Sequence, residues 1–328
     1  MNYSDVVYGE ATIEEPILQD LMASSAMRRL KSVLQHGITG LIGVTQPVTR
    51  FDHSMGVMLL VRRMGGELNE QIAALLHDVS HTAFSHVVDY VYADHDGQGY
   101  HDRVKEEYVS ETDLPAIFAR LGLSWRDFMD ETGFTILEQP APRLCADRVD
   151  YFLRDSIELE LATPEKIDEV LADLLVHNGR LAVKTIDIAR WIGRTYIAAD
   201  DSSWANFREV GLYELTARAI KTGLRLGVMG EADFWSTDKP VWKMLNSSSN
   251  FELQSQMRLV SPDTQFVWDE ESPTFRVSTK IRTVDPDVLI DGTLRPLSTL
   301  DEEFAVFREE YINRKTGLWP MRVIPPAS

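Results

Sequence analysis

The chain has 328 residues, of which 44% are hydrophobic and 26% charged, so it has the composition of a soluble globular protein with about two structural units. Its net charge of −18 disfavours binding to long DNA or RNA, because an acidic surface repels their phosphates, but small anionic substrates remain compatible where bound metals or arginines reverse the local field. No apolar run of about 18 residues predicts a membrane span, and Cys145 as the only cysteine excludes an internal disulfide and fits a reducing cytoplasm.

Helices are predicted over most of the first 260 residues, because apolar residues recur there at spacings of three and four. The predicted segments are 23–35, 53–66, 68–77, 81–92, 101–110, 141–158, 185–198 and 205–228. The helix at 68–77, with Asn69 as its expected cap, is hydrophobic on nearly all sides, which is typical of a buried helix. His77 and Asp78 are therefore expected at the end of a rigid core helix.

Strand signals follow later in the chain. Residues 174–184 are a hairpin candidate, with Asn178-Gly179 as a type I′ turn. The alternating segment 274–283 predicts a strand, and Asp285-Pro286-Asp287 predicts a turn. A last helix is expected from Ser298 to Arg314, capped near Ser298 or Thr299.

These elements predict a mainly α-helical fold with a small β-containing C-terminal region. We expect a helical core over 1–200, a helical extension packed on it over 201–260, and a small α+β region over 261–328. The polar segment 247–250 is the best linker candidate. The apolar 205–228 helix could contribute to a homo-oligomer interface, although the sequence leaves the oligomeric state open.

Three of the eight histidines and two aspartates lie between His77 and Asp89. The adjacent His77-Asp78 pair offers a divalent metal one nitrogen and one oxygen, a mixture that suits iron, manganese, zinc, nickel or magnesium. Such a metal lowers the pKa of a bound water and polarises a phosphoryl oxygen. On the helix predicted from 81, His81 would point from the first turn toward this pair. His86 and Asp89 lie at i and i+3, so the carboxylate could orient the imidazole of a general acid.

Other candidate ligands lie on separate segments: His53 in Arg50-Phe-Asp-His53, the pair His101-Asp102, and Asp147. On a helix Asp147, Tyr151 and Asp155 share one face, so Asp147 could bind a metal while the other two reach toward a substrate. A single histidine or aspartate is more often structural or solvated. We assign His36, His95 and His177 to that class, His36 with the least support, and Asp102 and Asp150 could be ordinary solvated carboxylates.

The ordered motifs resemble those of the HD-domain phosphohydrolases, specifically the branch that contains the dNTP triphosphohydrolases. The resemblance rests on Arg50-Phe-Asp-His-Ser54, Leu75-Leu-His-Asp-Val-Ser-His-Thr-Ala-Phe-Ser-His86, His101-Asp102 and Asp147-Arg-Val-Asp-Tyr151. It covers residues 15–160 strongly and the helices after 200 more loosely. It implies an HD-domain helical bundle and the hydrolysis of a small phosphorylated substrate, with a nucleotide favoured.

The resemblance also implies roles for individual residues. The principal metal would be bound by His53, His77, Asp78 and Asp147. His81 and His101 would face a second metal or the phosphates, and His86, oriented by Asp89, would be the proton donor or base. Substrate contacts are implied for Arg50 and Arg148 at the phosphates, Gln35 at the sugar, and Tyr151 and Asp155 in the nucleotide pocket.

This sequence departs from the family pattern beside the expected site but keeps every expected ligand. Ser80 replaces a glycine, Thr82-Ala83 replaces Gly-Pro, and Asp102 replaces a glutamate. The long basic stretches that grip a nucleotide and an obvious allosteric module are missing, which weakens the triphosphate assignment more than the phosphohydrolase one. Gly99-Tyr100-His101 is not the GYP signature of cyclic-dinucleotide phosphodiesterases. Two alternatives remain open: a nucleotide-binding sensor that signals through the C-terminal region, and a di-iron oxygenase on the same helical scaffold.

Overall fold

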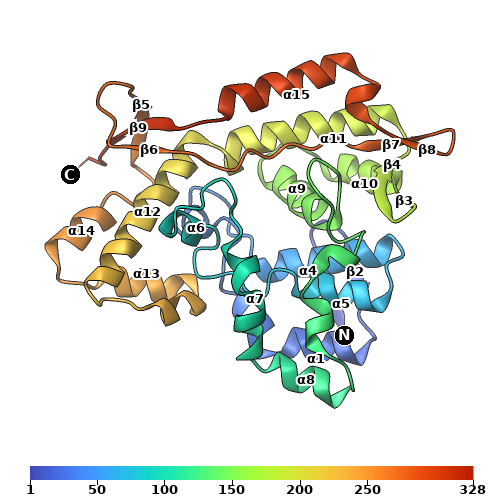
Figure 1. Cartoon of the computed structure of the whole chain (residues 1–328), viewed down its shortest axis with the longest axis horizontal. Helices are drawn as coiled ribbons and strands as arrows, with labels where there is room; N and C mark the ends of the chain where they lie inside the picture. The colour runs from blue at the N-terminus through green and yellow to red at the C-terminus, as the bar shows by residue number, and fades with distance from the viewer. Residues whose placement is uncertain (328) are drawn as a thin grey trace.

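The computed structural model describes residues 1–327, which form 15 α-helices and nine short strands (Figure 1). The helices are α1 (Pro16–Ala23), α2 (Ser25–Leu30), α3 (Gly37–Leu41), α4 (Arg50–Arg63), α5 (Leu68–Leu76), α6 (Val87–Val91), α7 (Tyr100–Ser110), α8 (Leu114–Arg120), α9 (Ala146–Glu158), α10 (Pro164–Asp173), α11 (Ile186–Ala199), α12 (Phe207–Arg225), α13 (Asp238–Asn246), α14 (Phe251–Met257) and α15 (Glu302–Lys315). The strands are β1 (Asn2–Asp5), β2 (Gly9–Thr12), β3 (Leu174–His177), β4 (Arg180–Val183), β5 (Gln265–Trp268), β6 (Phe275–Val277), β7 (Asp287–Ile290), β8 (Thr293–Pro296) and β9 (Trp319–Ile324). The predicted fold class, mainly α with small sheets, is confirmed.

The buried helix pair α4 and α5 carries the first candidate ligands. Helix α4 is capped by Thr49, whose hydroxyl accepts from the backbone N–H of Asp52. Helix α5 is buried from Gln71 to Leu76, as its all-round apolar pattern predicted, and His77 follows at its C-terminal end. The prediction that Asn69 caps α5 is wrong, because the helix begins at Leu68 and Asn69 lies in its first turn.

The helix predicted over 81–92 is wrong in its first half, because only Val87–Val91 is α-helical. Phe84 and Ser85 have φ values of 61° and 50°, and two consecutive left-handed residues cannot continue a right-handed helix. Tertiary contacts hold this loop: the carboxylate of Asp238 accepts from the backbone N–H of Phe84 at 2.8 Å. Gly37 also approaches closely, since a Cβ there would lie 2.2 Å from the Phe84 carbonyl oxygen.

Three further helix boundaries differ from their predictions. The helix expected at 23–35 ends at Leu30, and the one expected at 141–158 begins only at Ala146, after the prolines at 140 and 142. The last helix begins at Glu302 rather than Ser298, with the Asp301 side chain accepting from the Phe304 N–H, while 297–299 is a separate 3₁₀ turn.

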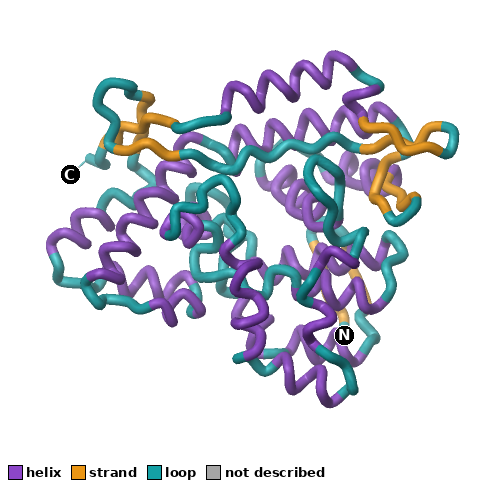
Figure 2. The backbone as a smooth tube through the Cα atoms, in the orientation of Figure 1, coloured by secondary structure: helices purple, strands orange, loops and turns teal. Residues whose placement is uncertain are grey.

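Two small sheets lie at opposite ends of the longest dimension, as Figure 2 shows in orange. The predicted β3–β4 hairpin is confirmed, with φ of 51° at Asn178 and 72° at Gly179, as a type I′ turn requires. Strand β4 also pairs in parallel with β7. The two hairpins β3–β4 and β7–β8 therefore form one four-stranded sheet of order β3-β4-β7-β8. The other sheet has the order β5-β9-β6, with β9 in the middle.

The strand predicted over 274–283 is largely wrong, because only Phe275–Val277 pairs with a neighbour. Residues 278–286, which we call the C-terminal strap, run without strand pairing from β6 to β7 along the teal segment between the two sheets in Figure 2. Segment 247–250 is a turn between α13 and α14, where the Asn250 side chain caps α14. The three-part division of the chain remains a prediction.

The buried apolar side chains form two separate hydrophobic cores. The first involves α1, α2, α4, α5, α8, α9, α10 and α11, together with Phe304 of α15. The second involves α12, α13, α14, β6, β9 and the segment 83–91. None of the large apolar side chains of α12 is exposed, because the helix packs into the second core, and its part in a homo-oligomer interface remains a prediction. No helix within residues 1–327 has the length and apolar character of a membrane span.

Candidate metal and substrate site

Three predicted ligands from three helices converge on one point. The Nε2 atoms of His53, on α4, and His77, after α5, are 3.2 Å apart, and Asp147 Oδ1, on α9, lies 3.0 Å from the first and 3.6 Å from the second. Asp78 adds Oδ1 at 3.5 Å from His77 Nε2 and Oδ2 at 3.7 Å from His53 Nε2. The structure therefore brings the four predicted principal ligands together as two imidazole nitrogens and two carboxylates.

The outer nitrogen of each imidazole is held by an acceptor. His53 Nδ1 lies 2.7 Å from Asp150 Oδ2, and His77 Nδ1 lies 2.7 Å from the Ala74 carbonyl oxygen. Because these acceptors favour a proton on Nδ1, they leave the inner Nε2 lone pair available for a metal. The expectation that Asp150 is solvated is wrong: it is fully buried and also ion-paired with Arg154 at 2.9 Å.

The charges of this cluster are those of a cation site. Burial opposes protonation of His77, but Asp78 and Asp147 outweigh it and raise the pKa of His77 to about 10. Burial also raises the pKa of Asp147, yet hydrogen bonds with His53 and His77 hold the pKa of this carboxyl well below its usual range. The carboxylates of the buried Asp78 and the half-buried Asp147 stabilise protons on the neighbouring imidazoles and would equally attract a divalent cation. The donor set therefore fits a metal of the iron, manganese, zinc, nickel or magnesium type.

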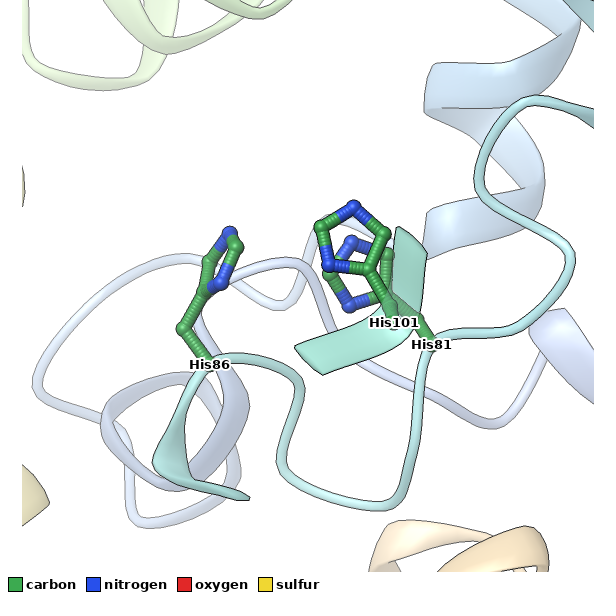
Figure 3. A group of neighbouring side chains, drawn as sticks. All are labelled: His81, His86 and His101. Carbon is green, nitrogen blue, oxygen red and sulfur yellow. The ribbon is translucent and has the colours of Figure 1, made fainter. Parts of the chain in front are cut away.

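A second cluster consists of His81, His86 and His101, whose nitrogens lie within 4.8 Å of one another. Figure 3 shows the overlapping rings of His81 and His101, with His86 facing them from the loop before α6. The rings of His81 and His101 are stacked with centroids 3.9 Å apart, and those of His86 and His81 are edge-on at 5.0 Å. These three residues could hold a second cation or contact a phosphate.

The predicted His86–Asp89 pair is present, with His86 at the N-cap of α6 and Asp89 in the first turn of that helix. His86 Nδ1 lies 3.0 Å from Asp89 Oδ2, because a turn followed by one helical turn also brings i and i+3 together. Burial and the charge of Arg50 hold the pKa of His86 well below its usual range, and burial raises the pKa of Asp89 to about 6. His86 is thus neutral near pH 7, with a proton on Nδ1 and a free Nε2.

Asp78 connects the two clusters. Its Oδ2 accepts from Arg50 Nη1 at 2.6 Å, and its Oδ1 lies 3.1 Å from His81 Nε2. Burial and the positive charge of Arg50 hold the pKa of His81 well below its usual range. Asp102, in contrast, is 62% exposed, as expected of a solvated carboxylate.

Both clusters line one cavity of about 800 Å³. Four of the five residues predicted to contact substrate also line it: Gln35, Arg50, Arg148 and Tyr151. Asp155 does not, because its carboxylate is bound to His36 Nε2 at 3.1 Å and to Trp204 Nε1 at 2.6 Å on the side of a neighbouring cavity. His36, which we expected to be structural, lines both cavities, whereas His95 and His177 line neither.

The predicted substrate-binding residues differ in whether their polar atoms already form hydrogen bonds within the protein. The side-chain oxygen Oε1 of Gln35 is buried and has no hydrogen-bond partner. Arg148 donates to the carbonyl oxygen of Gln139 at 2.6 Å and to Glu138 Oε1 at 2.8 Å. The hydroxyl of Tyr151 is hydrogen-bonded to that of Tyr196. Gln35 is therefore the contact best placed to accept a hydrogen bond from a ligand.

The sequence analysis missed several residues of the cavity wall. These are Tyr90, Lys105, Tyr196, Trp204, Tyr213, Lys280, Arg282 and Arg308. Lys280 and Arg282 flank Ile281, so in the predicted strand 274–283 both cations would lie on the same face. The prediction of a strand gave no reason to place that face beside the metal ligands.

Comparison with known proteins places this geometry in context. The HD domain family matches residues 50–155. The metal-dependent phosphohydrolase cns2 of Cordyceps militaris is 35% identical over 321 residues, covering 95% of this chain and 92% of that protein. The uncharacterised protein YdhJ of Bacillus subtilis is 36% identical, with coverage of 97% and 98%.

Two solved structures resemble the fold at low sequence identity. A phosphohydrolase from Bacteroides thetaiotaomicron superposes with a TM-score of 0.70 at 14% identity, covering 100% of both chains. A hypothetical protein from Aquifex aeolicus superposes with a TM-score of 0.68 at 18% identity, covering 99% of this chain and 96% of that one.

Proposed function

Because the chain belongs to the HD-domain family of metal-dependent phosphohydrolases, we propose that it hydrolyses a phosphate ester or anhydride of a small molecule, with nucleotides as the favoured substrate class. One observation carries this proposal: His53 Nε2, His77 Nε2 and Asp147 Oδ1 converge while Asp150 and Ala74 occupy the outer nitrogens. We assign His53, His77, Asp78 and Asp147 as the ligands of the principal metal. Such a metal, when bound, lowers the pKa of a water and polarises a phosphoryl oxygen.

The remaining polar residues have separate proposed tasks. Arg50, which reaches the metal cluster through Asp78, would offset charge that grows on the phosphoryl oxygens. His86 would hold the proton that the leaving oxygen needs. In the free protein the ring is neutral, but the negative charge of a bound phosphate would raise the pKa of His86, so that Nε2 takes up a proton together with the substrate. Nε2–H would then donate this proton to the leaving oxygen while Asp89 keeps the ring in place.

The nucleotide preference rests on the aromatic side chains that line the cavity. Trp204 lies edge-on to Tyr151 at a centroid distance of 4.9 Å, and such rings suit a nucleobase. The unpartnered Oε1 of Gln35 would accept from a sugar hydroxyl. His81 and His101 would contact a second cation or the phosphates. We propose no contact for Asp155, because His36 and Trp204 already occupy its oxygens.

The decisive experiment combines metal analysis of the purified protein with a phosphate-release screen over nucleotides and other phosphate esters. We expect bound divalent metal and phosphate release that continues without oxygen. His77→Ala should lose both, and His177→Ala, at the end of β3 outside the cavity, should lose neither. Binding of a nucleotide without turnover would favour a sensor, and oxygen-dependent turnover would favour a di-iron oxygenase.

A further inference from the structure

The cavity is lined by three cations that form no ion pair with a carboxylate among residues 1–327. Among residues 1–327, no carboxylate oxygen lies within 4.0 Å of the charged nitrogens of Lys280 and Arg282, on the C-terminal strap, or of Arg308, on α15. The other cations that line the cavity are each ion-paired: Arg50 with Asp78, Lys105 with Glu131 and Arg148 with Glu138. The wall formed by the C-terminal region therefore has three cationic side chains without a directly paired carboxylate, and Asp200 accepts only from the Arg282 backbone.

The backbone of the strap is fixed, although its cations have only neutral partners. The Arg282 N–H donates to Asp200 Oδ2 at 3.1 Å, and the hydroxyl of Thr279 accepts from Tyr90 at 3.0 Å. The guanidinium of Arg282 contacts the side-chain oxygen of Gln98 and the carbonyl oxygen of Lys280. Lys280 Nζ has one long contact, 3.4 Å to the Gly97 carbonyl oxygen. Arg282 and Arg308 are half-buried and Lys280 is exposed. Cations held in place without an ion-pair partner form strong hydrogen bonds with an anion that enters.

We propose that Lys280 and Arg282, with Arg308 beside them, form a phosphate-binding subsite on the side of the cavity contributed by the C-terminal strap. The subsite selects a dianionic terminal phosphate, as in a phosphate monoester or at the end of a phosphate chain, over the single charge of a phosphodiester. This inference rests on the proposed function, since it specifies which phosphate-containing molecules enter the same cavity. It also gives the C-terminal region a direct part in substrate recognition.

Binding of inorganic phosphate tests the subsite separately from catalysis. Titration calorimetry near pH 8, with and without divalent metal, compares the wild type with Arg282→Gln and Lys280→Gln. Arg276→Gln is the matched control, because Arg276 lies in the adjacent strand β6, is ion-paired with Glu270 and does not line the cavity. We expect Arg282→Gln to weaken phosphate binding by at least about tenfold and Lys280→Gln by a smaller factor, with dimethyl phosphate binding more weakly than phosphate.

The possible outcomes separate the two proposals. Equal phosphate affinity in the wild type, Arg282→Gln, Lys280→Gln and Arg276→Gln, or no measurable binding by the wild type, overturns the subsite. A further outcome is a protein that binds phosphate through Arg282 and yet hydrolyses nothing in the screen. That result supports the subsite and contradicts the proposed reaction. If thermal melting shows that Arg282→Gln is unfolded, Lys280→Gln decides, since its exposed side chain makes a single long contact.

Discussion

Arg50 and Asp78 form a buried ion pair, with Nη1 of the arginine 2.6 Å from Oδ2 of a proposed metal ligand. The same guanidinium donates to Ser85 Oγ at 3.0 Å and to the Gln35 carbonyl oxygen at 3.3 Å. Arg50 therefore links a metal ligand to the loop before His86 and to the segment that carries Gln35. Without metal, it is the main positive charge that compensates Asp78.

This pair predicts a metal-dependent stability defect. Arg50→Met should lower the free energy of unfolding of the metal-free protein by roughly 3–5 kcal/mol, because Asp78 is left buried without its partner. Saturating Mn²⁺ should restore more stability to this variant than to the wild type, since a cation replaces the lost charge. Urea denaturation with and without metal measures both effects. In the double variant Arg50→Met/Asp78→Asn the loss should be smaller than the sum of the single losses, and strict additivity would contradict the coupling.

The position of His86 predicts a loss of turnover without a loss of metal. His86→Ala should slow phosphate release by roughly a hundredfold or more, because the leaving oxygen loses its proton donor. The principal metal should be retained, since His53, His77, Asp78 and Asp147 are unchanged. Single-turnover assays and metal analysis on the same preparation measure the two effects. His177→Ala is the control, and wild-type turnover in His86→Ala would remove His86 from the mechanism.

The close approach of Gly37 to the Phe84 carbonyl predicts that the loop carrying His86 is sensitive to one methyl group. Gly37→Ala should destabilise the protein by about 2–4 kcal/mol, because its Cβ would lie 2.2 Å from a backbone oxygen at φ +52°. Gly43→Ala is a matched control, with φ +76° and no atom within 4 Å of its Cβ, and should cost only about 1–2 kcal/mol of backbone strain. Thermal denaturation measures the difference in stability between the two variants. Equal losses of stability in Gly37→Ala and Gly43→Ala would show that the loop at Phe84 moves to accommodate the added methyl group.

Asp200 predicts a defined pH dependence of stability. Burial raises the pKa of Asp200 to about 6 from 3.8, so between these values the folded state binds more protons than the unfolded state. The contribution of Asp200 to the free energy of unfolding therefore falls as pH rises from about 4 to 6, and this loss is complete above pH 6.

Asp200→Asn should remove this loss. Oδ2 accepts from the Arg282 N–H and from Tyr311, whereas Oδ1 is buried without a partner, so an amide nitrogen there breaks no bond. We expect a gain on the order of 2–3 kcal/mol above pH 6 that vanishes below about 4. Chemical denaturation across this range measures it, with Asp168→Asn, exposed on α10, as control. A gain that is constant with pH would rule out the charge as its cause.

Much of the site could be predicted because its residues belong to local motifs. His77 and Asp78 lie at the end of a helix whose buried character is visible in its composition. His86 and Asp89 meet at i and i+3 even though the helix begins only at Val87, because His86 is its N-cap. These features depend on residues a few positions apart. They therefore remain correct even where a helix boundary is wrong.

The parts that could not be predicted depend on contacts between distant residues. Asp150 meets His53 across 97 positions of the chain, and nothing in the neighbouring sequence distinguishes it from a solvated aspartate. Asp155 shares a helix face with Asp147, yet Trp204 binds it, because α11 ends in a π-helical turn over Asp200–Trp204. The strap reaches the cavity only because β6 and β7 belong to different sheets.

The order of the β5-β9-β6 sheet connects the last residues of the chain to the cavity. Strand β9 is the middle strand, so β5 and β6 each have it as their only partner in that sheet. Removal of Trp319–Ile324 by proteolysis or a premature stop would leave β6 unpaired and release one anchor of the segment that carries Lys280 and Arg282. Loss of β9 would thus affect Lys280 and Arg282, some forty positions earlier in the chain, through the sheet rather than along the backbone.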